Sequence, residues 1–335
     1  MTLRHVAEVG GRVRAAVLTG PGQIDLADRV LPPPGPGQVR LRVLQCGLCA
    51  GEVAEWAGRA PAEFPEAIGH EVAGQVAEVG DGVTTVRVGD HVAAWVSGGG
   101  FAEQAVAEER CCVPVAPGLR YPAVAEPLAC VVNAVELAAP ALGDDVAIVG
   151  AGFMGLLTLL VSALKGPRSI TVADTRPDAL ARAADLARAA GPHGLRVITT
   201  DPGSLPDVIG DLSDASGADV TYEVTGVNQG LELASLITRM SGTLCIVGFH
   251  QGGSRTIPLG DWNWRALRIV NAHFRETDTI MTGLRAGLRL VNAGILDPSP
   301  LVTHAYPLSR IDEAFHAASR RPDGFIKAVV QPAAG

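Results

Sequence analysis

The distribution of apolar and polar residues changes near Glu126 and divides the chain into two differently patterned parts. Before this point, short apolar or alternating runs are separated by clusters of Gly and Pro, a pattern typical of strands joined by turns. Five strands are expected there: Val13–Leu18, Gln38–Leu44, Val72–Val79, His91–Val96 and Phe101–Val106. The first part of the chain is therefore predicted to form a β-rich domain.

After Glu126, apolar strands alternate with segments of helical periodicity, which predicts a parallel, doubly wound α/β sheet. The expected strands are Val146–Val149, Ser169–Ala173, Val197–Thr200, Val220–Val224, Leu244–Val247 and Leu267–Ala272. The expected helices are Pro127–Ala138, Pro177–Ala190 and Leu231–Met240. The sequence then closes with two further helices and a strand, Thr279–Asn292, Arg310–Arg320 and Phe325–Val330.

These patterns predict two domains, of which the first is discontinuous because we expect the tail to return to it. The β-rich domain is expected over residues 1–129 and 275–335, and the doubly wound domain over residues 130–274. A length of 335 residues is enough for each of two domains to bury a sizeable core.

The segment Gly150–Gly155 has the pattern G-x-G-x-x-G, follows an apolar strand and opens a helix. In this context the pattern predicts a Rossmann dinucleotide site. Gly150 permits a tight turn, Gly152 lets the backbone approach a pyrophosphate, and Gly155 lets helix and strand pack closely. The free N–H groups of the helix N-terminus favour a bound phosphate.

Asp174 ends the next predicted strand, 24 residues beyond Gly150. A carboxylate at this place accepts hydrogen bonds from ribose hydroxyls and repels a 2′-phosphate, so NAD is expected rather than NADP. Arg176 acts in the opposite sense, because an arginine nearby can bind a phosphate.

The net charge of −8 argues against a nucleic-acid partner, and no block of like charges predicts a membrane anchor. Residues Met1–Arg12 lack the apolar core of a secretory signal, and the six cysteines do not form a dense disulfide framework. Val146–Leu164 is uncharged, but its glycines indicate a strand, a turn and a helix rather than a membrane span. We therefore expect a cytoplasmic protein that does not bind membranes.

Three short features before the dinucleotide motif supply candidate metal ligands: Cys49, the run Gly69-His70-Glu71, and the run Glu126-Pro127-Leu128. Each alone is weak, because a single Cys is most often a small buried residue. Combined with the G-x-G-x-x-G motif near the middle of the sequence, they resemble the zinc-dependent medium-chain dehydrogenase/reductase family. The nearest branch contains the polyol, cyclitol and sugar-alcohol dehydrogenases, and the resemblance extends from about Val13 to Val330.

This resemblance implies a GroES-like catalytic domain followed by a Rossmann domain that binds NAD. It also implies one catalytic zinc ion held by Cys49 and His70, with Glu71 as a ligand in the polyol branch. Glu126 stands where alcohol dehydrogenases place a cysteine ligand, and whether Glu71 or Glu126 binds the metal directly stays open. A thiolate, an imidazole and a carboxylate with one open position suit catalytic zinc.

The resemblance also implies which other residues contact the dinucleotide, in the glycine motif or at the carboxyl ends of the predicted strands. They are Phe153, Met154, Thr175, Arg176, Val224, Thr225, Val247, Gly248 and Asn271.

Two departures from the family pattern change the expectations. No cysteines lie between His91 and Arg110, so no structural zinc is expected. Gly51 and Ala54 occupy the positions of the family's proton relay, so the proton should leave through water, with Glu126 or Glu71 as the carboxylate. Glu52 replaces an aspartate of the family and is expected to orient His70.

The resemblance predicts an NAD-dependent enzyme that oxidises a secondary hydroxyl of a polyol, cyclitol or sugar to a ketone. Glu55 and Trp56 are expected at the substrate cleft, where the polyol enzymes place an aromatic residue in the position of Glu55. An acidic residue there would suit an amino sugar, as in aminoglycoside-type biosynthesis. His250 is a further candidate for contact with the substrate or cofactor, and a homodimer or homotetramer is expected.

Two other functions are compatible with parts of this pattern. A zinc-free quinone or enoyl reductase using NADPH would share both domains, but its branch lacks the Cys49, His70 and Glu126 set. A non-catalytic dinucleotide-binding protein is favoured only by the loss of the relay at Gly51 and Ala54.

Overall fold

The computed structural model describes residues 11–116, 124–190, 195–212, 217–251 and 253–332. The protein divides into two compact units. The first comprises Met1–Glu126, His304–Arg321 and Lys327–Gly335, and the second Pro127–Thr303 and Pro322–Ile326.

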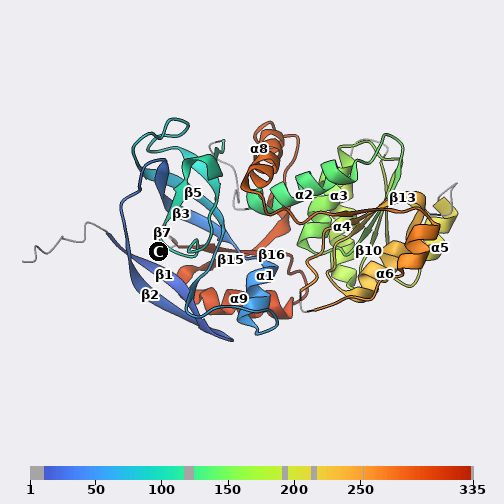
Figure 1. Ribbon diagram of the computed structural model, residues 1–335, viewed down its shortest axis with the longest axis horizontal. Helices are drawn as coiled ribbons and strands as arrows, with labels where there is room; N and C mark the ends of the chain where they lie inside the picture. Colours follow the sequence, from blue (N-terminus) through green and yellow to red (C-terminus); the bar gives the residue numbers. More distant parts are fainter. Residues whose placement is uncertain (1–10, 117–123, 191–194, 213–216, 252, 333–335) are drawn as a thin grey trace, which may run out of the picture. The chain divides into compact units, whose positions relative to one another are not determined.

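The first unit is built mainly from antiparallel strands in two sheets (Figure 1). The smaller sheet has the order β2-β1-β4, and the larger has the order β15-β16-β3-β5-β6-β8, with β7 also paired to β3. The strands are β1 (Gly11–Gly20), β2 (Gln23–Leu31), β3 (Gln38–Gly47), β4 (Glu66–Ala67), β5 (Glu71–Val79), β6 (His91–Trp95), β7 (Gln104–Glu108), β8 (Cys112–Pro114), β15 (Val302–Pro307) and β16 (Lys327–Gln331). The helices are α1 (Ala50–Trp56), α9 (Ile311–Arg320) and the short 3-10 turns η1 (Glu109–Cys111) and η4 (Leu308–Arg310).

Strand β16 lies beside β3, although their sequences are far apart. The register pairs Val329 with Gly47, and the N–H of Leu48 donates to the carbonyl of Ala328 over 3.1 Å. Strand β5 pairs with β3 on its other side, where Gly47 faces Glu71. The ends of three strands therefore meet where the sequence carries its candidate metal ligands.

The second unit contains a six-stranded sheet in the order β11-β10-β9-β12-β13-β14, and its neighbouring strands run parallel. The strands are β9 (Asp145–Val149), β10 (Ser169–Ala173), β11 (Arg196–Thr200), β12 (Ala218–Glu223), β13 (Thr238–Ile246) and β14 (Arg268–Asn271). The helices are α2 (Ala125–Ala138), α3 (Phe153–Ala163), α4 (Pro177–Ala190), α5 (Leu205–Leu212), α6 (Asn228–Ile237), α7 (Leu259–Trp264) and α8 (Thr277–Asn292), and η3 (Ser299–Leu301) is a 3-10 turn. The predicted combination of a doubly wound sheet and a β-rich domain is confirmed.

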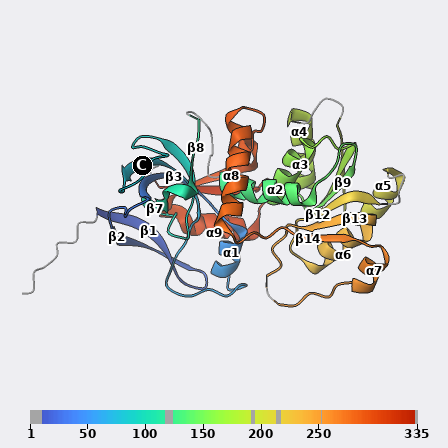
Figure 2. The same cartoon turned by 45° about the horizontal axis from the view of Figure 1, so that its top comes forward.

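Apolar residues cover both faces of this sheet because successive side chains of a strand point to opposite sides. Val146 and Ile148 of β9 join a core cluster with residues of α2, α3 and α4. Ala147 and Val149 join a second cluster with residues of α5, α6 and α7. Figure 2 shows α3 and α4 on one side of the strands and α6 and α7 on the other.

Helix α8 packs closely against α2 through two glycines. A Cβ atom on Gly283 would lie 2.5 Å from the carbonyl of Ala129, and one on Gly287 would lie 2.9 Å from the side chain of Leu128. Residues 275–303 accordingly group with the second unit, whereas the sequence placed them in the first domain. The amphipathic pattern of this segment predicted a helix, but it carried no information about which core the helix covers.

Several predicted elements have different bounds in the structure. The helix expected to reach Met240 ends at Ile237, because Thr238 adopts an extended backbone and pairs with Ala218 as the first residue of β13. The strand expected from Phe101 starts only at Gln104, since Phe101 instead binds the segment before His70. Strand β2 was missed because its side chains are mostly exposed and its apolar pattern is weak.

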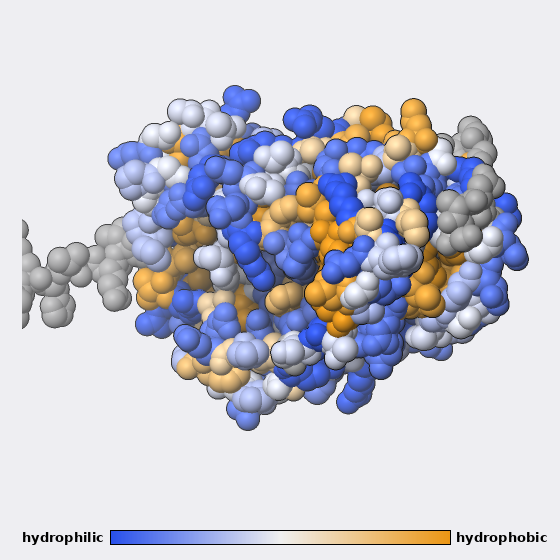
Figure 3. Space-filling model, turned by 45° about the vertical axis from the view of Figure 1, so that its right-hand side comes forward, coloured by the Kyte–Doolittle hydropathy of each residue, from blue (hydrophilic) through white to orange (hydrophobic). Residues whose placement is uncertain are grey.

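Within the part of the sequence that the structure describes, the helices are too short or too polar to serve as membrane spans. Apolar side chains are visible among polar ones on the face drawn in Figure 3.

The two tryptophans of α7 differ in burial. Trp262 is buried and donates to the hydroxyl of Ser235, whereas Trp264 is 81% exposed. The two tryptophans therefore have different roles, and only Trp262 is accounted for by packing within the unit.

Candidate metal and dinucleotide sites

Cys49 occupies the N-cap of α1, directly after the end of β3. Its backbone is extended, with φ of −83° and ψ of 140°, and its Sγ accepts from the N–H of Gly51 over 3.4 Å. This hydrogen bond fixes the direction of the sulfur atom at the start of the helix. The local fold thus prepares Cys49 to act as a metal ligand.

His70 and Glu71 follow a segment whose backbone is held by a glycine-rich loop. Gly99 and Gly100 donate to the carbonyls of Ala67 and Gly69 over 3.0 and 2.8 Å, and Phe101 donates to Ile68 over 3.2 Å. Gly69 has a φ of +99°, and a Cβ atom there would overlap the backbone of Phe101. Only glycine fits this position, which explains why Gly69 precedes the histidine.

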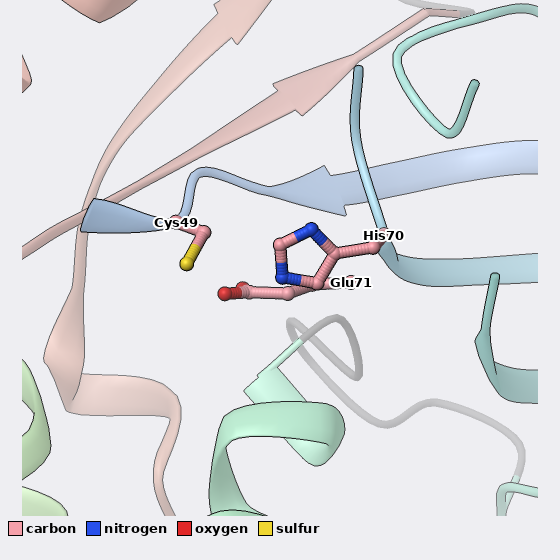
Figure 4. A group of neighbouring side chains, drawn as sticks. All are labelled: Cys49, His70 and Glu71. Carbon is pink, nitrogen blue, oxygen red and sulfur yellow. The ribbon is translucent and has the colours of Figure 1, made fainter. Parts of the chain in front are cut away.

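The side chains of Cys49, His70 and Glu71 converge on one point, as Figure 4 shows. One ligand atom from each lies within 4.8 Å of the other two. This spacing and the donor set of sulfur, nitrogen and oxygen fit a zinc ion with three protein ligands and one open position. In the described residues the group comprises these three side chains; Glu126 is not part of it and remains a proposed neighbour of the metal.

Glu52 supports this group from the first turn of α1, where it is buried. Its Oε1 accepts from the N–H of Gly69 over 2.7 Å and lies 3.0 Å from Nδ1 of His70. A proton on Nδ1 then satisfies the carboxylate and leaves Nε2 as the ring nitrogen for a metal. Burial lowers the pKa of His70, but the charge of Glu52 and hydrogen bonds with Cys49 and Glu52 raise that pKa well above its usual value.

Lys327, which no sequence motif singled out, lies behind Glu71. Its ammonium group donates to Oε1 of Glu71 over 2.8 Å and to the carbonyl of Leu48 over 2.9 Å. Burial lowers the pKa of Lys327, but the charges of Glu71, Cys49 and Glu126 raise it above its usual value, so the amine stays protonated. A lysine within the apolar run Phe325–Val330 was the signal that could have identified it, because lysine is almost never fully buried unless paired.

The three glycines of the dinucleotide motif have the geometry that their predicted roles require. Gly150 has a φ of +109°, and a Cβ atom there would lie 3.0 Å from Thr225. Gly152 is the N-cap of α3 with open space at its Cβ position, and a Cβ atom on Gly155 would overlap the carbonyl of Gly150. The space beside Gly152 is where a phosphate could approach the helix N-terminus.

Asp174 stands at the carboxyl end of β10. Its Oδ2 accepts from the N–H of Ala151 over 2.7 Å, and its Oδ1 accepts from the N–H of Arg176 over 2.8 Å. These bonds fix the carboxylate beside the glycine loop. The guanidinium Nε of Arg176 lies 3.7 Å from Asp178, whose pKa is lowered mainly by a hydrogen bond from the N–H of Gly324.

The other predicted dinucleotide contacts lie along one edge of the sheet or in the glycine motif. Thr175 follows β10, Val224 and Thr225 follow β12, Val247 and Gly248 follow β13, Asn271 ends β14, and Phe153 and Met154 open α3. The carboxyl ends of parallel strands are where doubly wound sheets bind ligands.

The three predicted substrate residues occupy different environments. Glu55 is half-buried, and burial and the charges of Glu66 and Glu52 raise its pKa. Trp56 is 5% exposed and packs on Phe315 with ring centroids 5.9 Å apart, and its place at the substrate cleft stays a prediction. Because neighbouring residues of a helix point in different directions around its axis, Trp56 lies in the core while Glu55 is only half-buried. His250 lies in the second unit, where both of its ring nitrogens have protein partners.

Comparison with known proteins gives consistent matches. Residues 35–117 match the family model "Alcohol dehydrogenase GroES-like domain". The chain is 28% identical to L-idonate 5-dehydrogenase of Vitis vinifera over 352 residues, covering 93% of each protein. It is 30% identical to L-threonine 3-dehydrogenase of Pyrococcus horikoshii over 348 residues, covering 90% of this protein and 94% of the relative.

Among solved structures, the fold is similar to a dehydrogenase from Sinorhizobium meliloti 1021 bound to NADP. The TM-score is 0.82 at 25% identity, and the match covers 96% of this protein and 100% of the other.

Proposed function

Because the chain belongs to the zinc-dependent medium-chain dehydrogenase/reductase family, we propose that it oxidises a secondary hydroxyl of a polyol, cyclitol or sugar to a ketone, with NAD as oxidant. The convergence of Cys49, His70 and Glu71 is the observation that carries this proposal. When bound, zinc and NAD supply the Lewis acid that acidifies the hydroxyl and the acceptor of the hydride.

The protein's own side chains hold and orient those groups. Cys49 and His70 contribute donors from a helix N-cap and from a loop fixed by backbone hydrogen bonds, and Glu52 sets the ring orientation of His70. Lys327 pairs with Glu71 in a buried position and so holds its carboxylate in place. The proton is proposed to leave through water, with Glu126 or Glu71 as the carboxylate that accepts it.

The preference for NAD over NADP rests on Asp174 and Arg176. The carboxylate of Asp174 is fixed beside the glycine loop, where it would repel a 2′-phosphate. The charge of Arg176 is partly neutralised by Asp178, so it is less available to a phosphate. A similar solved dehydrogenase is bound to NADP, so the preference for NAD has to be measured. The affinities for NADH and NADPH should be compared on the purified protein.

An amino-substituted substrate is supported by the position of Glu55. Burial, and then the charges of Glu66 and Glu52, raise the pKa of Glu55, and an ammonium group beside it would offset that repulsion. L-Threonine, named in one relative, also carries an ammonium group beside a secondary hydroxyl. We expect Glu55→Gln to raise KM about fivefold for an amino sugar or aminocyclitol and to leave KM unchanged for its neutral analogue. Equal effects on both substrates would exclude this specificity.

The main proposal is tested with zinc-loaded protein and a panel of polyols, cyclitols and amino sugars, followed by the absorbance of NADH. Cys49→Ser and His70→Ala should lose bound zinc, measured by elemental analysis, and lose turnover, while the affinity for NADH stays within about twofold of wild type. Ordinary turnover by either variant would refute the metal assignment. Zinc and NADH binding without oxidation of any substrate would favour the non-catalytic function, and turnover with NADPH in the absence of zinc would favour the quinone or enoyl reductase.

A further inference from the structure

A buried glutamate ties together two loops at the carboxyl edge of the parallel sheet. Glu223 is the last residue of β12 and is 0% exposed. Its Oε1 accepts from the N–H groups of Thr225 and Gly226 over 2.6 and 2.9 Å and from the hydroxyl of Thr225. Its Oε2 lies 2.8 Å from Nε2 of His250, in the loop after β13. One carboxylate thus organises both loops.

Arg255 fixes the protonation pattern of His250. The Nε–H of Arg255 points to Nδ1 of His250 over 3.3 Å, and because arginine does not lose its proton, Nδ1 must be the acceptor. The ring proton then sits on Nε2 and is donated to Glu223. Arg255 also donates to the carbonyl of Gln251 over 2.6 Å, so its guanidinium holds both His250 and the residue after it. The imidazole connects a buried carboxylate to a guanidinium of opposite charge.

The loop after β12 packs against the glycine motif, and the loop after β13 packs against the loop after β12. A Cβ atom on Gly150 would lie 3.0 Å from the side chain of Thr225, which Glu223 holds. A Cβ atom on Gly226 would lie 2.7 Å from the carbonyl of Phe249, and one on Gly248 would lie 2.5 Å from Oε2 of Glu223. A shift of the loop that carries His250 would therefore reach the loops that line the dinucleotide site.

The location of the network within the sheet indicates which half of a dinucleotide it affects. In doubly wound sheets a dinucleotide crosses the carboxyl edge at the point where the strand order reverses. Here Asp174 marks the adenosine side after β10, and β12, β13 and β14 lie on the opposite side of β9. The loops joined by Glu223 and His250 are those after β12 and β13. They lie on the side of the nicotinamide.

We propose that His250 is a positioning residue that, by joining Glu223 to Arg255, shapes the surface that receives the nicotinamide half of the cofactor. The inference rests on the proposed dinucleotide-dependent function. We propose this positioning role in place of the direct substrate contact expected from the sequence, because both ring nitrogens of His250 already have partners within the protein. The adenosine half depends on Asp174 and the glycine motif, and should be insensitive to this network.

The test compares affinities for NADH and for ADP-ribose, which lacks the nicotinamide, by isothermal titration calorimetry. His250→Ala should weaken NADH binding about tenfold, since a buried hydrogen bond to a charged group is lost, and should change ADP-ribose affinity by less than about twofold. His250→Gln should restore most of the NADH affinity, because its amide can donate to Glu223 and accept from Arg255. Arg255→Met removes the other end of the network and should act like His250→Ala. His91→Ala, an exposed histidine of the first unit, is the matched control.

Each other outcome overturns the proposal in a distinct way. Unchanged NADH affinity in both His250→Ala and Arg255→Met would show that the network has no positioning role. Equal weakening of NADH and ADP-ribose, or no recovery with His250→Gln, would assign the network to general stability of the unit. If His250→Ala does not fold, Arg255→Met decides, because Arg255 is half-exposed. A wild-type protein that binds neither ligand would refute the proposed function itself.

Discussion

The ammonium group of Lys327 lies 2.8 Å from Oε1 and 2.7 Å from Oε2 of Glu71, and the two residues are only 5% and 2% exposed. A buried charge pair of this kind contributes little net stability relative to apolar residues, but removal of one partner leaves an uncompensated buried charge. The carboxylate of Glu71 is at the same time a candidate metal ligand, so Lys327 connects the stability of the first unit to its site.

Lys327→Met should destabilise the metal-free protein by about 3–5 kcal/mol, because Glu71 would remain buried without its partner. Urea unfolding followed by circular dichroism measures this change. Lys165→Met is the matched control, because Lys165 pairs with Glu136 near the surface and should cost less than about 1 kcal/mol. Equal stability of the two variants would mean that the buried pair is not needed.

Glu52→Gln should weaken zinc binding by about 10- to 100-fold, the usual effect of losing a partner that orients a histidine ligand. The amide keeps an oxygen for the N–H of Gly69, so the loop should stay in place. Competition with a coloured chelator measures the affinity. Glu63→Gln, at an exposed position, should bind zinc like wild type, and an unchanged affinity in Glu52→Gln would remove the orienting role.

Gly69→Ala should lower the free energy of unfolding by more than the backbone strain of an alanine at this positive φ would account for. A positive φ costs an alanine about 1–2 kcal/mol, and overlap with the backbone of Phe101 should add about 1–3 kcal/mol. Gly82→Ala separates the two effects, because Gly82 has a φ of +78° with nothing near its Cβ position. Equal melting temperatures for both variants would contradict the role of the Gly98–Phe101 loop as a support for His70.

Asp178→Asn should improve NADPH binding by roughly fivefold, about 1 kcal/mol, by releasing Arg176 to meet a 2′-phosphate. The asparagine oxygen can still accept from Gly324, and NADH binding should not change. Fluorescence titration with both cofactors measures the effect. Asp185→Asn removes a similar exposed carboxylate from the same helix, and an equal gain in that variant would indicate a general charge effect.

We expect a homodimer or homotetramer in solution. Strand β14 is an edge strand, and the second unit exposes Leu236, Met240, Leu259 and Trp264. Exposed apolar side chains in such numbers often mark an interface. Trp264→Ser should shift the species measured by light scattering towards monomer, whereas Leu142→Ser, at another exposed position of the same unit, should not. A monomeric wild type would refute the expectation.

Much of this architecture could be predicted because it is encoded locally. The apolar run Val146–Val149 and the glycines at 150, 152 and 155 specify a strand, a turn and a helix through the sterics of neighbouring residues. The place of Asp174 could be predicted in the same way, because it ends the strand that follows the glycine motif and its helix. The candidate metal ligands could be chosen because Cys, His and Glu are chemically distinctive, and the structure brings Cys49, His70 and Glu71 together. Glu126 could not be ranked against Glu71 in this way, since ligand spacing depends on tertiary geometry.

The sequence by itself determined the alternation of strands and helices in the second unit, the dinucleotide loop and the types of ligand available, because these depend on short-range sterics and on side-chain chemistry. Only the tertiary structure decided that Lys327 pairs with Glu71 across 256 residues, that Trp56 turns into the core, and that His250 bonds to Glu223 rather than standing free. Those outcomes depend on which side chains are buried together, and burial is a property of the packed protein that no local pattern contains.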